Sequence, residues 1–288
     1  MIKEGYDDAR QAEDLFDGYY GPNSISEQVG RDGHWFSIEN PTSTEAENYL
    51  GVSDTIYAFL ELIRLKEIIV PKNNARALDM FSGTGHDLIR FHKLGYAEAV
   101  GFDISEQGVI AARGLATATI ETTRLGQIGF HKYNIFDALP TGGKFDLVWS
   151  RGGVDYIKNH IRVIELGQNE TKPGGANVFS AVVNEPKSLV GLSSVPCHSR
   201  VPLNPVSVEM LRELYSPERG WTELYFQVVR DKEDTSHPDG EFNPKIDRHS
   251  HDIVNGIWRY DGINAQSRSK SGLIIPRLIR GRATMLPR

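Results

Sequence analysis

The sequence predicts an α/β fold with a doubly wound, mostly parallel sheet. Short apolar segments alternate with segments of helical periodicity between residues 77 and 183, a pattern typical of parallel strands joined by crossover helices. The first apolar segment runs into a glycine turn, Gly83 to Gly85, that opens a helical segment. An aspartate, Asp103, ends the second apolar segment about 20 residues later, at the place where nucleotide-binding sheets carry an acidic residue.

The predicted elements follow one another in a regular order. Strands are expected over residues 77–81, 99–103, 130–133, 145–150, 177–183 and 224–229, and helices over 86–94, 105–115, 155–166 and 206–215. Neighbouring parallel strands require right-handed crossovers, which the intervening helices supply. The turn Pro173-Gly174-Gly175 precedes the fifth strand and separates it from the helix before.

The chain divides into two predicted parts. Residues 1–70 form a helical N-terminal lid, with helical spacing at 7–19 and a second helix that begins at Ser53 or Asp54. Residues 71–288 form the sheet domain. Two polar inserts, near 185–205 and 231–251, are expected to roof the substrate site, and the second is expected to be a surface loop.

Composition and charge narrow the function classes. The 288 residues carry a formal net charge of −6, which argues against a nucleic-acid partner because such partners select basic surfaces. The one cysteine, Cys197, cannot form a disulfide within the chain, which fits a reducing compartment. The first ten residues do not resemble a signal peptide, and no apolar run approaches the ~20 residues that span a bilayer. We expect a cytoplasmic protein without membrane contact; the oligomeric state is unknown.

The glycine turn by itself has more than one interpretation. Glycines let the backbone approach a ligand closely because no Cβ is in the way. A short Gly-x-Gly also occurs in structural turns and in dinucleotide sites. Asp103 fits a ribose-binding carboxylate, and its alternative role is the N-cap of the helix that begins near Ser105 and Glu106.

Five segments in order resemble the motifs of class I S-adenosylmethionine (SAM)-dependent methyltransferases of the small-molecule branch. They are residues 78–85 (first motif), 100–105 (second motif), 133–140 (adenine-contacting segment), 145–150 (fourth strand) and 172–175 (turn before the fifth strand). The resemblance implies a seven-stranded Rossmann-like sheet that binds SAM and releases S-adenosylhomocysteine. Two residues depart from the family pattern: Phe81 stands where glycine is frequent, and Asn134 stands where aspartate is usual.

The resemblance also implies which residues contact the cofactor. These are Asp79, Phe81, Ser82, Gly83 and Gly85 in the first motif, Asp103 and Ile104 in the second, Asn134, Ile135 and Phe136 in the adenine segment, and Ser150 at the end of the fourth strand. Tyr19 and Tyr20 belong to a Tyr-Asp-rich N-terminal segment like those that open many relatives. We expect a cation–π contact between one of them and the sulfonium; simple packing of the helix on the sheet is the alternative.

The acceptor side is implied by the segment after the fourth strand, which in the family lies beside the reacting methyl group. The predicted catalytic residues are Arg151, Asp155 and Tyr156. Arg151 is expected to clamp a substrate carboxylate, or else to form a surface ion pair. Asp155 is expected to act as a base or to orient an amine, or else to face a helix dipole. No metal site is predicted.

We therefore predict in-line methyl transfer from SAM to a small polar acceptor, such as an amino acid or a natural-product-like metabolite. Two alternatives keep the cofactor: use of the aminocarboxypropyl arm or cyclisation of SAM, with release of methylthioadenosine, and a non-catalytic SAM-binding regulator. A nicotinamide dehydrogenase is disfavoured because Leu88 stands at the place of the third glycine of its motif.

Overall fold

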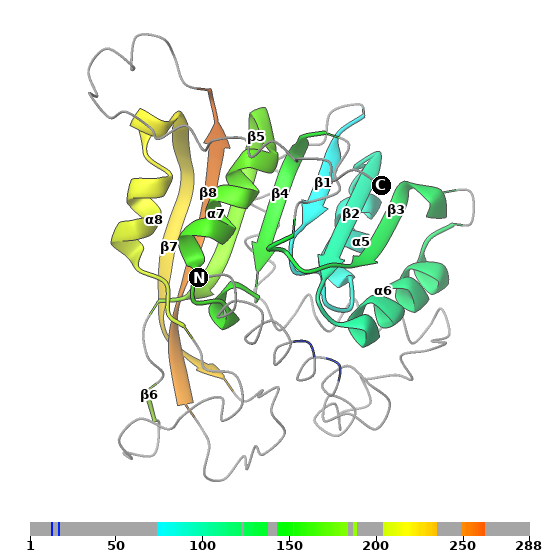
Figure 1. Ribbon diagram of the computed structural model, residues 1–288, viewed down its shortest axis with the longest axis horizontal. Coiled ribbons are helices and arrows are strands. Elements are labelled where there is room, and N and C mark those ends of the chain that lie inside the picture. Colours follow the sequence, from blue (N-terminus) through cyan, green and yellow to red (C-terminus); the bar gives the residue numbers. More distant parts are fainter. Residues whose placement is uncertain are drawn as a thin grey trace, which may run out of the picture.

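A mixed β-sheet with helices on both faces forms the part of the protein that the computed structural model describes (Figure 1). The described residues are 13, 17, 74–121, 124–137, 143–151, 153–183, 187–188, 204–234 and 249–262. The strands are β1 (Arg76–Asp79), β2 (Glu98–Asp103), β3 (Ile128–Lys132), β4 (Phe145–Arg151), β5 (Thr171–Val182), β6 (Lys187–Ser188), β7 (Trp221–Asp234) and β8 (His249–Tyr260). The α-helices of these ranges are α5 (His86–Lys93), α6 (Glu106–Thr119), α7 (His160–Glu170) and α8 (Val208–Leu214).

The strand order confirms the predicted sheet. Neighbouring strands follow the order β3-β2-β1-β4-β5-β8, and the long strand β7 pairs with the far side of β8. Strands β1 to β5 are parallel to one another, whereas β8 is antiparallel to both β5 and β7. The two-residue strand β6 also pairs with β8, as an addition to the seven strands that the family resemblance implies.

Two buried layers hold the helices on the sheet. One layer joins α5 and α6 to the sheet through residues such as Leu88, Ile89 and Leu115, all of which are buried. The other layer lies on the opposite face, where Val163 of α7 and Leu211 of α8 pack toward the sheet. In parallel strands both faces are buried by helices, so the carboxyl edge of the sheet is the place where ligands bind in this architecture.

Four elements differ from the sequence-based expectation. The predicted helix over 155–166 begins later: a 3₁₀ turn at Val154–Tyr156 comes first, and α7 starts at His160 behind the N-cap Asn159. The predicted turn at Pro173-Gly174-Gly175 lies inside β5, where the pairing with β4 shifts register and Gly174 has φ +80°. A left-handed glycine lets a strand absorb such an irregularity.

The late strands account for the other two differences. Strand β8 was not predicted, and β7 extends well beyond the expected 224–229, so both ends of the expected loop at 231–251 are strand. Gly256 lies inside β8, and a Cβ there would lie 2.0 Å from the Trp258 ring. The glycine is therefore a packing requirement of the strand rather than a turn.

Buried hydrogen bonds among three side chains hold the end of α8 against this part of the sheet. The Tyr215 ring stacks on Trp258 with centroids 4.1 Å apart. Its hydroxyl donates to Asn177 Oδ1 at 2.9 Å, and Asn177 Nδ2 donates to Thr171 Oγ1 at 3.3 Å. Tyr215, Asn177 and Thr171 are all buried, so each bond replaces one with water.

We predict that Tyr215→Phe lowers the free energy of unfolding by about 1–3 kcal/mol, because Asn177 Oδ1 loses its donor in a buried place. Denaturant unfolding measures the change. Tyr260→Phe is the matched control, since the Tyr260 hydroxyl makes no hydrogen bond to the described residues. Equal stability of the two variants would contradict the role given to the Tyr215 hydroxyl.

Candidate active site

The turn after β1 is shaped by its glycines. Ser82 N–H donates to Phe102 O at 2.9 Å, which holds the turn against the end of β2. Gly83 and Gly85 have φ of +47° and +78°, a region that other residues rarely adopt. A Cβ on Gly85 would also lie 2.5 Å from the Phe130 ring and 2.8 Å from Ala112. The backbone therefore turns sharply into α5 at the carboxyl edge, with the N–H groups of Ser82, Gly83 and Gly85 bonded within the protein.

Asp103 connects this turn to the next one. Its Oδ2 accepts from Gly83 N–H at 2.7 Å, and its Oδ1 accepts from Ser105 N–H at 2.9 Å. Burial raises the pKa of Asp103 above its ordinary value, although both hydrogen bonds act in the opposite direction. Helix α6 is capped by Ser105, whose Oγ accepts from Gly108 N–H at 3.0 Å. Asp103 is thus not the N-cap, and its partly buried carboxylate lies at the carboxyl edge of the sheet.

The turn also contains a buried hydroxyl without a partner. Ser82 is 4% exposed, and its Oγ makes no hydrogen bond among the described residues. A buried donor left unpaired costs about 1–3 kcal/mol, so a ligand group that pairs with it would gain that interaction. The positive-φ glycines, the Ser82 hydroxyl and the Asp103 carboxylate fit a ligand with ribose hydroxyls and a polar tail, as SAM has.

Phe81, which departs from the family pattern, is accommodated by a glycine on another loop. A Cβ on Gly153 would lie 2.3 Å from the Phe81 ring. The Phe81 N–H donates to Asp79 Oδ1 at 3.1 Å. The bulky ring thus packs between the glycine turn and the loop after β4, and it brings these two segments into contact. The expected contact of Phe81 with a cofactor stays a prediction.

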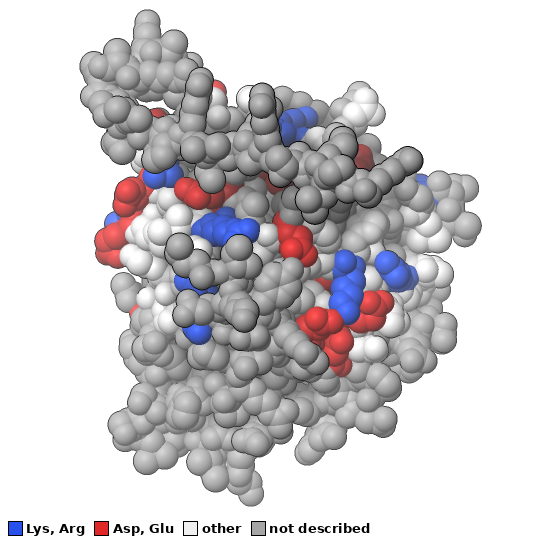
Figure 2. Space-filling model, viewed as in Figure 1, with Lys and Arg blue, Asp and Glu red and all other residues white. Residues whose placement is uncertain are grey.

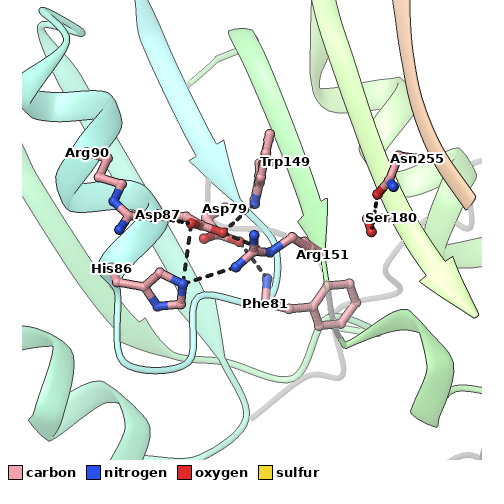
Figure 3. Close-up of polar contacts among 9 residues, drawn as sticks. All are labelled: Asp79, Phe81, His86, Asp87, Arg90, Trp149, Arg151, Ser180 and Asn255. Atoms are coloured by element: carbon pink, nitrogen blue, oxygen red, sulfur yellow. Dashed lines mark hydrogen bonds and ion pairs between the residues drawn. The ribbon is translucent and has the colours of Figure 1, made fainter. Parts of the chain in front are cut away.

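A buried charge cluster lies at the start of α5 (Figure 3). Asp87 Oδ2 accepts from Trp149 Nε1 at 3.0 Å and pairs with Arg151 Nε at 3.2 Å. Asp87 Oδ1 lies 3.3 Å from His86 Nε2 and 3.6 Å from Arg90 Nη1. Burial acts to raise the pKa of Asp87, but Arg151, His86 and Arg90 lower it below its ordinary value. The cluster thus joins α5 to the end of β4 through an ionised carboxylate.

Burial shifts the pKa values of two neighbours of Asp87 in opposite directions. Burial lowers the pKa of His86 to about 4, so the imidazole is neutral at pH 7. Burial and the charge of Asp87 raise the pKa of Asp79 well above its ordinary value. Arg151 lies beside both carboxyl groups, with its Nη2 also 3.1 Å from His86 Nε2. A surface ion pair is the alternative role that the sequence predicts for Arg151. Arg151 does form an ion pair, but its partner Asp87 is buried.

Asp155 and Ser150 are turned into the protein. Asp155 Oδ1 accepts from Val182 N–H at 2.7 Å, and burial raises the pKa of Asp155 to about 7. The residue lies in a 3₁₀ turn before α7 rather than at the N-terminus of that helix. Ser150 is 3% exposed, and its hydroxyl donates to Met80 Sδ at 3.3 Å. Because side chains alternate along a strand, Ser150 faces α7 while Arg151 faces α5, and the backbone of Ser150 is what remains at the site. Tyr156 is half-buried in the same turn.

The predicted adenine segment forms a short turn after β3. Asn134 Oδ1 accepts from Phe136 N–H at 3.0 Å, so the side chain closes its own turn. Ile135 is buried in the core on the α7 face. Phe136 lies under the Arg162 guanidinium at 5.0 Å, and Ile104 is half-buried beside Asp103. Contacts of these residues with adenine stay predictions.

The N-terminal segment reaches the same edge through two described residues. Asp17 Oδ1 accepts from Ser105 Oγ–H at 2.6 Å and from Gln107 N–H at 3.1 Å. Glu13 Oε1 pairs with Lys132 Nζ at 2.5 Å. Asp17 thus binds the N-terminal end of α6, where the helix dipole favours an anion. Tyr19 and Tyr20, the predicted lid aromatics, lie outside the described residues, as do the expected helix from Ser53 and Cys197.

Sequence reasoning missed His86, Asp87 and Trp149. The available signal was His86-Asp87 directly after the glycine turn, since an acid at the start of a helix beside a basic strand end predicts pairing.

Within the described ranges, no group of three or more His, Cys, Asp or Glu side chains could hold a metal ion. The helices of these ranges are all too short or too polar to cross a membrane. On the face in Figure 2, the described basic and acidic side chains lie in small mixed groups.

The pH dependence of stability tests the environment of Asp155. Because folding raises its pKa from 3.8 to about 7, the folded state holds a proton that the unfolded state has lost, and stability falls as the pH rises through this window. Asp155→Asn does not ionise. We predict that its free energy of unfolding, relative to the unsubstituted protein, increases by roughly 2–4 kcal/mol between pH 4 and pH 8. Urea unfolding at both values measures this, and parallel pH profiles would contradict it.

Comparison with known proteins identifies the family. A family model described as a methyltransferase domain matches residues 71–215, half of the chain. Among curated proteins, no sequence matches significantly. The fold is similar to magnesium protoporphyrin IX methyltransferase from Synechocystis PCC 6803, solved with S-adenosylhomocysteine bound (TM-score 0.54, 15% identity, 88% of this chain and 99% of that one). It is also similar to a putative methyltransferase from Bacillus halodurans C-125 (0.54, 13%, 70% and 99%).

A third similar structure is TehB from Haemophilus influenzae (TM-score 0.50, 17% identity), where the match spans 69% of this chain and 61% of that one. At these identities the structures establish the fold, and the family model covers the glycine turn, Asp103 and the segment after β4. The chain belongs to the class I SAM-dependent methyltransferase family.

Proposed function

We propose that this protein transfers the methyl group of SAM to a small polar acceptor and releases S-adenosylhomocysteine. The observation that carries the proposal is the Asp103 carboxylate, held at 2.7 Å from Gly83 N–H at the carboxyl edge of the sheet. A carboxylate in this position accepts hydrogen bonds from ribose hydroxyls. A structural relative that holds S-adenosylhomocysteine has the same fold, which supports the choice of cofactor.

The methionine end of SAM is assigned to the glycine turn. Ser82 offers an unpaired buried hydroxyl there, and Gly83 and Gly85 offer a backbone that a ligand can approach closely. Arg151, fixed by Asp87, carries a positive charge to this turn and suits a carboxylate of either the cofactor or the acceptor. SAM supplies an activated methyl group, so the protein has to align the nucleophile and remove its proton.

The acceptor side is assigned to Arg151, Asp155 and Tyr156. Asp155 is the proposed base, because a carboxyl group with a pKa of about 7 takes up a proton at neutral pH and releases it again. In this role the carboxyl group exchanges its bond with Val182 N–H for one with the acceptor. Tyr156 is the proposed wall of the acceptor site, with Tyr19 and Tyr20 as the proposed lid. The acidic net charge of the chain favours a small acceptor over a nucleic acid.

Asp103 is the residue on which cofactor binding depends in this proposal. Asp103→Ala removes the ribose-binding carboxylate and loosens both turns, so we expect SAM affinity to fall at least roughly tenfold, about 1.4 kcal/mol. Calorimetric titration with SAM measures the dissociation constant. Glu165→Ala, at an exposed carboxylate of α7, is the control and should bind SAM as the unsubstituted protein does. Unchanged affinity in Asp103→Ala would remove Asp103 from the cofactor site.

Turnover of SAM to S-adenosylhomocysteine tests the proposed methyl transfer and the role of Asp155. Mass spectrometry of the protein with SAM, alone and with the low-molecular-mass fraction of a cellular extract, should detect S-adenosylhomocysteine only with the extract. Asp155→Asn should lower this turnover about 100-fold or more, the usual effect of a lost general base, with SAM affinity intact. Methylthioadenosine formed from SAM alone would replace methyl transfer by cyclisation or arm transfer. SAM binding without any product would favour a regulator.

A further inference from the structure

A row of polar side chains crosses four strands at one level of the sheet. Arg151 of β4 is in register with Ser180 of β5, Ser180 with Asn255 of β8, and Asn255 with Gln227 of β7. Residues paired in register project from the same face of a sheet. The face is that of α5 and α6, because the row one step earlier along β4 (Trp149, Val178, Ile257 and Tyr225) belongs to the core on that face.

Apolar residues occupy nearby positions on the same face of the sheet, so the fold does not need polar side chains there. Trp149, Val178 and Ile257 are 4%, 6% and 3% exposed, and Val182, one step beyond Ser180 on the same face, is 7% exposed. A sheet of this kind is stabilised by apolar residues at such positions. Ser180 and Asn255 are half-buried and Gln227 is exposed, so the polar row is partly accessible beside these apolar positions.

The hydrogen bonds of the row to described residues use the amide oxygens, because Asn255 Oδ1 accepts from Ser180 and Gln227 Oε1 accepts from the Tyr225 hydroxyl. Ser180 Oγ–H donates to Asn255 Oδ1 at 2.7 Å (Figure 3). This bond fixes the orientation of the amide, and Asn255 Nδ2 makes no hydrogen bond to another described residue. Arg151 does not use the pair, because its guanidinium turns toward Asp87 (Figure 3). A half-buried amide whose donors lack protein partners is a specific binding group when a ligand covers it.

We infer that Ser180 and Asn255, extended by Gln227, determine acceptor specificity by binding an uncharged oxygen-bearing group of the acceptor. The inference rests on the proposed methyl transfer and names the chemical class of its substrate. The group is a carbonyl, carboxamide or hydroxyl, because Asn255 Nδ2 donates and the row of Ser180, Asn255 and Gln227 carries no charge. A charged acceptor group beside Asn255 and Gln227 would meet no charge of opposite sign on these described side chains and is disfavoured.

The sheet also sets the size of the acceptor. Strands are about 4.8 Å apart, so Asn255 on β8 lies two spacings, roughly 10 Å, from the end of β4, where the methyl group is assigned. An acceptor that reaches both places has its nucleophilic atom and its uncharged oxygen group roughly 10 Å apart. This length excludes the smallest amino acids and fits an elongated metabolite of the natural-product type.

The test compares variants in the presence of the low-molecular-mass fraction of a cellular extract as the probe. Asn255→Leu keeps the side-chain size and removes the amide, and Ser180→Ala frees the amide to rotate. We expect both to lower the initial rate of S-adenosylhomocysteine formation at least tenfold at low extract concentration, with most of the loss recovered at high concentration. The SAM dissociation constant should stay within twofold, since the row lies away from Asp103.

Thr222→Val on the exposed start of β7 is the matched control and should keep the full rate. If Asn255→Leu alone lowers SAM affinity, Asn255→Ser repeats the test with a smaller disturbance of the sheet. Unchanged rates in Ser180→Ala and either Asn255 variant would overturn the inference while methyl transfer stands. The absence of S-adenosylhomocysteine with the unsubstituted protein would instead overturn the proposed function, and with it the inference.

Discussion

The two hydrogen bonds of the Asp103 carboxylate are the constraint on which the rest of the site depends. They join Gly83 N–H in the turn after β1 to Ser105 N–H in the turn after β2. Adjacent parallel strands bring both turns to one edge, but their loops would otherwise move independently. With both turns tied to one side chain, the glycine backbone, the unpaired Ser82 hydroxyl and the start of α6 form one surface. Asp17 adds the N-terminal segment to it through Ser105.

A second tie links this surface to the acceptor side. Asp87 would be costly to bury as an isolated charge, and its contacts with Arg151, Arg90 and the Trp149 indole offset that cost. Since Asp87 opens α5 and Arg151 ends β4, the cluster sets the distance between the glycine turn and the segment after β4. Phe81 and Gly153 reinforce the same junction by packing. The two halves of the proposed reaction are thus held by buried contacts rather than by a flexible loop.

How far the sequence predicts this arrangement differs between backbone and side chains. The parallel strands and their helices were predicted because apolar runs, the glycine turn and Asp103 are local signals. Strand β8 was not predicted, because its stability comes from pairing with β5 and β7. A partner so distant in sequence leaves no local pattern.

Among the side chains too, those placed by local signals were predicted and those placed by distant contacts were not. Asp103 was predicted at the site because its role follows from where its strand ends. Ser150 and Asp155 bond to Met80 and Val182, partners that are visible once the strand faces are known. The Asp87 cluster needs five residues from α5 and β4 to meet, which spacing along the chain does not encode. The row of Ser180, Asn255 and Gln227 likewise depends on register, which is set by the whole sheet.

A crystal structure with S-adenosylhomocysteine bound tests the central claim most directly, namely that the edge organised by Asp103 is the cofactor site. The account predicts both ribose hydroxyls on the Asp103 carboxylate, with the amino-acid end of the ligand along residues 82–85 and its sulfur toward the segment after β4. A ligand bound elsewhere, or at this edge without contact to Asp103, would contradict the account.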